Sequence, residues 1–291
     1  MNALTITRRN LRLFFRDRAA VFFSLLSALI LIGLYGLFLG NQQVDALQQQ
    51  FPKASAGDVR AFVVAWVFAG VAMITTLTTS LSSLSQLVDD ASSGRFRDFL
   101  VSPVRRIELI LGYLLSSFVV SVLVTVVTVV VGELYLGITA GVIMTFAQMA
   151  TCLSYICLSS GAFVALSAFV VGFVASRQAF TALATIVGTL VGFLAGAYIP
   201  PGVLPAGVVN VLQALPFAQS AMLIRQPLTH DPLAAMTGGV ARADSVISAF
   251  YGMTAKIGDV TVTNGWAIGE LAAIIVVFLA LGAWRMGRRI R

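Results

Sequence analysis

Residues 61–88 read AFVVAWVFAGVAMITTLTTSLSSLSQLV, an uncharged run that ends at the acidic pair Asp89-Asp90. An α-helix rises about 1.5 Å per residue, and about 20 apolar residues cross the hydrocarbon core of a bilayer. The run is long enough to form a transmembrane helix. It therefore indicates a membrane protein and gives the starting point for the rest of the chain.

The composition of the whole chain supports this class. Of the 291 residues, 58% are hydrophobic and 11% are charged, and the mean hydropathy is +0.94. An ordinary soluble domain carries about 25% charged residues. Little of the chain is left for a soluble catalytic domain, so we expect no enzymatic activity from this chain itself.

The residues that carry most catalytic chemistry are scarce. The chain has two cysteines, Cys152 and Cys157, and a single histidine, His230, which are too few for a metal cluster or a Cys–His nucleophile. Its two lysines, Lys53 and Lys256, are not followed by Ser or Thr, which excludes a phosphate-binding P-loop. We expect no catalytic residue, no metal, no cofactor and no nucleic-acid partner.

Further apolar runs predict an all-α membrane protein with six transmembrane helices. Gly137 and Gly141 mark a turn before the fourth helix, and Pro200-Pro201 stops the fifth. The expected transmembrane helices cover residues 19–40, 61–88, 107–132, 142–176, 178–197 and 266–284.

Arginine predicts which side of the membrane each end occupies. Basic residues close to the ends of spans mark the cytoplasmic side. Six spans place both termini in the cytoplasm, together with 14 of the 19 basic residues. We expect a multi-pass protein of the plasma membrane, in a bacterial cell.

Residues 1–18 have the pattern of an amphipathic helix. At 100° per residue, Leu4, Leu11, Phe14 and Phe15 fall on one face, and arginines gather on the other. One interpretation is a helix that lies in the inner membrane interface. The alternative is that these arginines only orient the first span.

The loop 89–106 contains a short apolar stripe in a cytoplasmic setting. Phe96, Phe99 and Leu100 are spaced i, i+3 and i+4, as on one face of a helix. Gly94 marks its start and Pro103 its end. The stripe either docks on a partner protein or lies against the membrane surface.

A family resemblance favours the first alternative. The order of an acidic pair, Gly94, Phe99-Leu100, Ser102-Pro103, Glu108 and Gly112 resembles the cytoplasmic loop of ABC-2 type exporter permeases. In that family this loop is a coupling helix that docks on a separate ATP-binding subunit. The sequence departs from the usual pattern at the acidic pair, which is Asp rather than Glu, at Arg95 and at Tyr113. The resemblance implies a coupling role for Gly94, Arg95, Phe96, Asp98, Phe99, Leu100 and Pro103.

A second stretch is similar to the same family. Residues 196–205 read GAYIPPGVLP, and Leu215-Pro216-Phe217 follows. In ABC-2 permeases the corresponding segment forms short re-entrant helices in the outer leaflet. We expect residues 198–224 to be re-entrant and residues 225–265 to form an external loop. Pro200, Pro205 and Pro216 are candidates for a substrate pathway or a dimer seam.

The second span also carries many small hydroxyl residues, among them Thr75, Thr79 and Ser82. Such residues let transmembrane helices pack closely. They can also line a substrate route or a dimer seam, and the sequence leaves both interpretations open.

Together these features imply the permease subunit of an ABC exporter, which dimerises with itself or a close relative. ATP and Mg²⁺ would be bound by separate ATP-binding subunits, and the substrate would be an amphipathic or lipid-like molecule such as a drug, an antibiotic or a lipid. The alternatives are an ABC-2 exporter of a lipid-linked glycan and an ion-coupled secondary transporter. The latter should carry ionisable groups near the bilayer midplane, and no predicted span has a charge at its centre.

Overall fold

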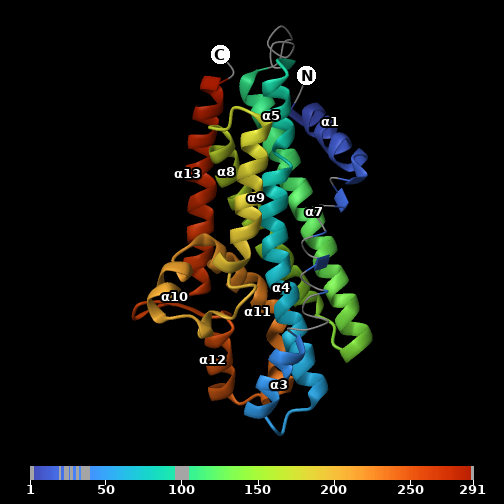
Figure 1. The fold of residues 1–291 in the computed structure, drawn as a ribbon, viewed down its shortest axis with the longest axis vertical. Helices are drawn as coiled ribbons and strands as arrows, with labels where there is room; N and C mark the ends of the chain where they lie inside the picture. The colour runs from blue at the N-terminus through green and yellow to red at the C-terminus, as the bar shows by residue number, and fades with distance from the viewer. Residues whose placement is uncertain are drawn as a thin grey trace.

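The fold is an elongated helical bundle, shown in Figure 1. The computed structural model describes residues 3–19, 21–22, 26, 29–30, 33, 40–95 and 105–289. Helix α1 and the C-terminal part of α13 lie at the same end of the bundle (Figure 1). The described helices and strands are α1 (Ala3–Arg16), α3 (Gly40–Gln50), α4 (Ala56–Ser82), α5 (Ser85–Ser92), α7 (Arg106–Ala140), α8 (Phe146–Val171), α9 (Arg177–Leu194), the 3-10 turn η2 (Pro201–Val203), α10 (Ala206–Gln213), α11 (Pro216–Thr237), α12 (Ala241–Phe250), β1 (Ala255–Ile257), β2 (Val260–Val262) and α13 (Asn264–Arg289).

Among the residues that the structure describes, five helical segments are long and apolar enough to cross a membrane: Ala56–Ser92, Arg106–Ala140, Phe146–Val171, Arg177–Leu194 and Asn264–Gly282. Each overlaps one of the last five spans expected from the sequence. The expected first span, 19–40, lies largely outside the described residues. The prediction of an all-helical membrane architecture is confirmed.

The proline-rich segment forms a sharply bent helix pair. Helices α10 and α11 meet at 84°, with a break of only two residues between them. Helix α11 continues to Thr237, so the boundary expected at residue 224 falls inside a helix. That boundary was drawn where a charge ends the apolar run, but Arg225 is buried at 1% exposure and the helix does not stop there.

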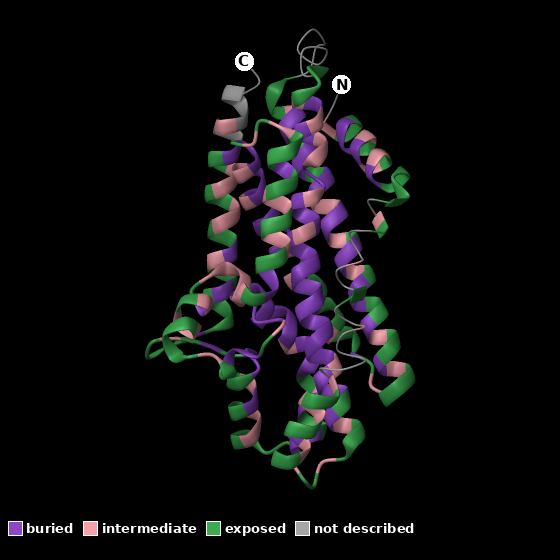
Figure 2. Cartoon of the chain, in the orientation of Figure 1, coloured by how far each residue is buried: buried purple, intermediate pink, exposed green. Residues whose placement is uncertain are grey.

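Helix α4 is the centre of the bundle. Of its most apolar window 89% is buried, compared with 17% in α9 and in α13, and Figure 2 shows α4 buried along most of its length. A helix that is apolar on all sides belongs in a protein interior or a bilayer. Helices α9 and α13 therefore provide much of the outer surface of the bundle.

Helix α1 packs on α7 with a face that includes Phe14 of the apolar face recognised in the sequence. Ile6, Asn10 and Phe14 are buried, whereas Leu4 and Phe15 are exposed. Phe14 contacts Val120 and Val124 in a small apolar cluster. The buried residues Ile6, Asn10 and Phe14 are four residues apart, a spacing that places them on one side of the helix toward α7.

Gly112 of α7 explains the close approach of α1. A Cβ atom at this position would lie 2.6 Å from Ile6 Cβ, so only glycine leaves the room that Ile6 occupies. Thr7 also donates a hydrogen bond to the Gly112 carbonyl at 3.3 Å. The glycine of the family pattern is therefore a helix-packing site here.

Strands β1 and β2 form a small antiparallel hairpin that the sequence analysis did not predict. Ala255 pairs with Val262, and Ile257 pairs with Val260. The Lys256 N–H donates to the Gln213 side chain at the end of α10, at 2.6 Å. The hairpin therefore ties the residues before α13 to the bent helix pair.

Candidate coupling site

Asp90 is the centre of a buried ion-pair cluster at the end of α5. Its carboxylate has no solvent exposure. Arg9 donates to both oxygens, with Nη1 2.7 Å from Oδ2 and Nη2 3.1 Å from Oδ1. Arg95 donates to Oδ1 at 3.1 Å, and the Tyr113 hydroxyl donates to Oδ2 at 2.5 Å. A buried carboxylate requires such partners because desolvation disfavours its charge.

The cluster connects three helices to the loop 89–106. Arg9 comes from α1, Asp90 from α5 and Tyr113 from α7, while Arg95 lies where the loop leaves α5. The hydrogen bond to Asp90 raises the pKa of Arg9 above its ordinary value. Because this fork-shaped contact is bidentate, it fixes orientation as well as distance.

Asp89, the other member of the acidic pair, forms an ion pair with a different helix. Asp89 Oδ1 lies 3.3 Å from Arg177 Nη1, at the start of α9. This pair is more exposed than the Asp90 cluster, with Asp89 23% and Arg177 73% exposed. The two adjacent aspartates thus connect α5 to opposite neighbours.

Of the expected coupling residues, the structure describes only Gly94 and Arg95. Gly94 has φ +77°, a left-handed conformation that favours glycine, at the turn after α5. Arg95 is 58% exposed and pairs with Asp90. Phe96, Asp98, Phe99, Leu100 and Pro103 lie outside the described residues.

Hydroxyl side chains form a seam, defined here as the hydrogen-bonded chain Thr76, Thr125, Ser80, Ser121 and Ser160. The Thr76 and Thr125 hydroxyls lie 3.2 Å apart, Ser80 donates to Ser121 at 3.0 Å, and Ser121 donates to Ser160 at 3.0 Å. The seam joins α4, α7 and α8 inside one chain.

The expected pathway residues of the second span lie beside this seam. Thr75 and Thr79 are fully buried, and Ser82 is half-buried. Thr79 donates to the Thr75 carbonyl within α4 at 2.6 Å. The Thr75 hydroxyl has no hydrogen-bond partner among the described residues. The hydrogen bonds that the Thr79 and Ser82 hydroxyls donate therefore stay within α4.

Each proline of the bent segment stands at the start of a helix. Pro200 precedes η2, Pro205 precedes α10, and Pro216 is the first residue of α11. Proline suits the start of a helix because its fixed φ is helical and no N–H is required there. The same residues that rule out one straight span thus mark the starts of three separate helices.

Arg225 holds this outer segment together. Its Nη2 donates to the carbonyls of Ala195 and Gly196 at 3.0 and 2.7 Å, and its Nη1 to that of Gly252 at 3.3 Å. Its guanidinium carbon also lies 5.4 Å from the ring centre of Trp66. One buried side chain therefore connects α11, the turn after α9, the turn after α12 and α4.

The family assignment rests on most of the chain. The family model described as ABC-2 type transporter matches residues 1–227. The chain belongs to this family. No curated protein matches the sequence of this ABC-2 permease.

Membership settles several general properties of the ABC-2 permease. It is a multi-pass membrane protein and the non-catalytic membrane part of an ABC transporter, a class of permease that generally pairs with ATP-binding subunits. It binds no cofactor itself, since ATP is bound by the partner ATPase. The matched region ends within α11, so α12, the hairpin and α13 lie beyond it.

The sequence analysis missed three residues of this ABC-2 permease that the structure brings into prominence. Arg9 was interpreted as part of a basic face, Tyr113 as a departure from the family pattern, and Arg225 as a loop residue. A signal existed for Tyr113, because it stands next to the glycine on which α1 packs. No local signal identifies Arg225, since its partners come from distant turns.

Proposed function

We propose that this ABC-2 permease is the membrane subunit of an ATP-driven exporter that moves an amphipathic or lipid-like substrate outward. The second half of the transporter would be another copy of the chain or a close relative. Both termini would lie in the cytoplasm. The observation that carries the coupling part of this proposal is the Asp90 cluster, since it lies where the loop 89–106 begins.

The cluster gives the loop a direct connection to the bundle. Asp90 is bound by Arg9 of α1 and Tyr113 of α7 as well as by Arg95. A displacement of the loop on the ATPase would therefore act on α1 and α7 together through contacts of 2.5–3.1 Å. We propose that Phe96, Phe99 and Leu100 dock on the ATPase, with Gly94, Arg95, Asp98 and Pro103 shaping that contact.

The exit side is proposed at the opposite end of the bundle. A cavity of about 510 Å³ lies there, lined by α3, the segment from Tyr198 to Val203, and α12. Pro200 lines it, and Pro205 and Pro216 start the helices that follow. We propose that this segment borders the outward end of the substrate route, and that Thr75, Thr79 and Ser82 border its inner part or a dimer seam.

The coupling proposal is tested with Asp90→Asn in the assembled transporter. The substitution keeps the size of the side chain and removes the charge that holds Arg9 and Arg95. We expect the ATPase to remain bound and to hydrolyse ATP, while substrate export falls. Asp89→Asn is the matched control, because its ion pair is exposed and its loss should have a smaller effect.

Docking is tested separately with Phe99→Ala. Full burial of an apolar side chain of this size gains roughly 1.5–3 kcal/mol, so its truncation should weaken co-purification of the ATPase and leave membrane insertion intact. Phe15→Ala, on the exposed face of α1, is the control. If a Phe96→Ala/Phe99→Ala double variant binds the ATPase and exports substrate normally, the loop has no docking role.

A further inference from the structure

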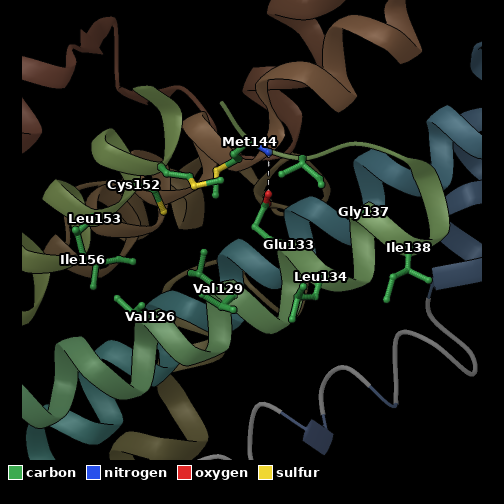
Figure 3. A pocket seen from close by; sticks show the side chains of 13 residues that line it. Val126, Val129, Glu133, Leu134, Gly137, Ile138, Met144, Cys152, Leu153 and Ile156 are labelled. Carbon is green, nitrogen blue, oxygen red and sulfur yellow. Dashed lines mark hydrogen bonds between the residues drawn. The ribbon is translucent and has the colours of Figure 1, made fainter. Parts of the chain in front are cut away.

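A second cavity lies between α7 and α8, far from the Asp90 cluster. Its volume is about 470 Å³, within the range of roughly 300–1,000 Å³ typical of small-molecule sites. Figure 3 shows the side chains from both helices and the α7–α8 connection that line it. The lining residues are Val126, Val129, Val130, Glu133, Leu134, Gly137, Ile138, Ile143, Met144, Met149, Cys152, Leu153 and Ile156.

The lining is apolar except at one point. Glu133 is the charged side chain of this set, and it is half-buried. Its Oε2 accepts a hydrogen bond from the Met144 N–H at 2.9 Å, drawn as the dashed line in Figure 3. A carboxylate has about four acceptor positions, so this bond leaves most of its capacity for another donor.

No cation of the chain satisfies this carboxylate in the part that the structure describes. The ion pairs there involve Asp89, Asp90 and Asp231, and none includes Glu133. A half-buried carboxylate beside an apolar cavity is costly without a partner of opposite charge. The charge of the site therefore favours a cationic ligand over a neutral or anionic one.

The position of the cavity along the helices fits an amphipathic molecule. Glu133 lies about 40 Å along α7 from Arg106 at about 1.5 Å per residue, beyond a hydrocarbon core of about 30 Å. Ile156 lies about 15 Å along α8 from its start, toward the centre of the bundle. The polar end of the cavity is thus at headgroup depth, and its apolar end reaches into the hydrocarbon region.

The cavity has a buried floor and an exposed rim. Val129, Met144, Cys152 and Ile156 are buried, whereas Val130, Leu134, Ile138, Ile143, Met149 and Leu153 are exposed. A ligand dissolved in the lipid phase can therefore enter from the side of the bundle. Entry requires no opening of the central helix α4.

We propose that this cavity binds a single-chain amphipathic cation, with its amine on the Glu133 carboxylate and its hydrocarbon tail along Val129 and Ile156. This binding does not rest on the proposed export function, because it needs neither the ATPase nor ATP. The two proposals can therefore fail independently.

The test uses the permease alone in phosphatidylcholine nanodiscs. The probe is a dodecylamine that carries a photoreactive diazirine in its tail, and cross-linked peptides are mapped by mass spectrometry. We expect labelling within residues 126–138 and 144–156, displaced by unlabelled dodecylamine much more effectively than by dodecanol.

Glu133→Gln separates the charge from the structural role of Glu133. The amide oxygen can still accept from the Met144 N–H, so the α7–α8 connection keeps its hydrogen bond. Affinity for dodecylamine should fall about tenfold or more, as expected for a charged hydrogen bond, and affinity for dodecanol should not change. Glu270→Gln, at a half-buried carboxylate of α13, is the matched control and should change neither.

Val130→Trp should block binding of both molecules by filling the mouth of the cavity. Equal competition by dodecanol and dodecylamine, together with an unchanged Glu133→Gln variant, would show a hydrocarbon groove without cation selectivity and overturn the proposal. Disulfide cross-linking of Leu134→Cys between two copies would also overturn it, because a second copy would then cover the rim.

Discussion

Asp90 of α5 and Arg225 of α11 are both buried charges, and each is stabilised in a different way; Figure 1 shows α5 at the end of the bundle near the termini and α11 farther along it. Asp90 is bound by side chains, two of which, Arg9 and Arg95, are 29% and 58% exposed. Arg225 donates to three main-chain carbonyls. Side-chain partners can be exchanged by rotation, whereas carbonyl partners move only with the backbone.

The partners of Asp90 can therefore rearrange, whereas the partners of Arg225 are fixed by the backbone. The carbonyls that accept from Arg225 include those of Gly196 and Gly252, whose φ values are +61° and +70°. These left-handed turns orient the carbonyls inward without the strain that other residues would meet there. At the Asp90 end, loss of one arginine still leaves another. The consequences of substitution should therefore be larger at Arg225.

The largest expected effect is that of Arg225→Met. The substitution leaves three buried carbonyls without their donor, and each buried acceptor left unsatisfied costs about 1–3 kcal/mol, so we expect a loss of about 3–5 kcal/mol. Thermal unfolding in detergent measures the loss. Arg242→Met, at an exposed arginine of α12, is the control and should change stability little.

Gly252→Ala should have the next largest effect, about 2–3 kcal/mol, because a non-glycine residue is strained at φ +70°. A Cβ at this position would also lie 2.8 Å from Arg225 Nη1. The same thermal assay applies. Gly239→Ala, which has φ +71° and open space around it, isolates the backbone contribution. Equal losses in the two variants would mean that Arg225 adjusts without penalty.

Tyr113→Phe should cost about 1–2 kcal/mol, since a hydrogen bond to a charged group is lost while Asp90 keeps both arginines. The loss of stability in the double variant Arg9→Met/Tyr113→Phe, compared with the sum of the losses in the two single variants, then gives the coupling free energy between Arg9 and Tyr113. If Tyr113→Phe destabilises the protein as much as Arg225→Met, the Asp90 cluster tolerates the loss of a partner no better than Arg225 does, and the distinction between the two sites fails.

The smallest expected effect on stability is that of Arg95→Ala. Its guanidinium is largely exposed, and such ion pairs contribute about 0–1 kcal/mol. Although its effect on stability is small, the proposed function predicts that Arg95→Ala measurably weakens the coupling between ATP hydrolysis and export in the assembled transporter. Arg97→Ala is the neighbouring control for a general loss of positive charge in the loop.

The sequence predicted those parts of the fold that depend on local composition. Apolar runs identify spans because crossing a bilayer depends on the length and hydropathy of one segment. The proline-rich break was also predictable, since proline acts within its own turn. The α7 glycine, Gly112, was recognised from a family pattern, but its packing against Ile6 was not.

The partners of the buried charges could not be predicted from composition. Arg9 and Asp90 are 81 residues apart, and Arg225 and Gly196 are 29 residues apart. A charge normally ends an apolar run, so Arg225 was assigned to a loop. Its burial depends on two glycine turns that come together only in the folded chain.

The hydroxyl seam has a repeating spacing along the helices. Thr76 and Ser80 of α4 are one helical turn apart, and so are Ser121 and Thr125 of α7, with which they pair. Each hydroxyl both donates and accepts. A slide of one helix past the other by one turn, about 5.4 Å, would align only one pair of these hydroxyls and leave the other two without their partners, because each helix contributes two of them. The seam therefore sets the axial alignment of α4 and α7, because both separation and displacement along the helix axis break these hydrogen bonds.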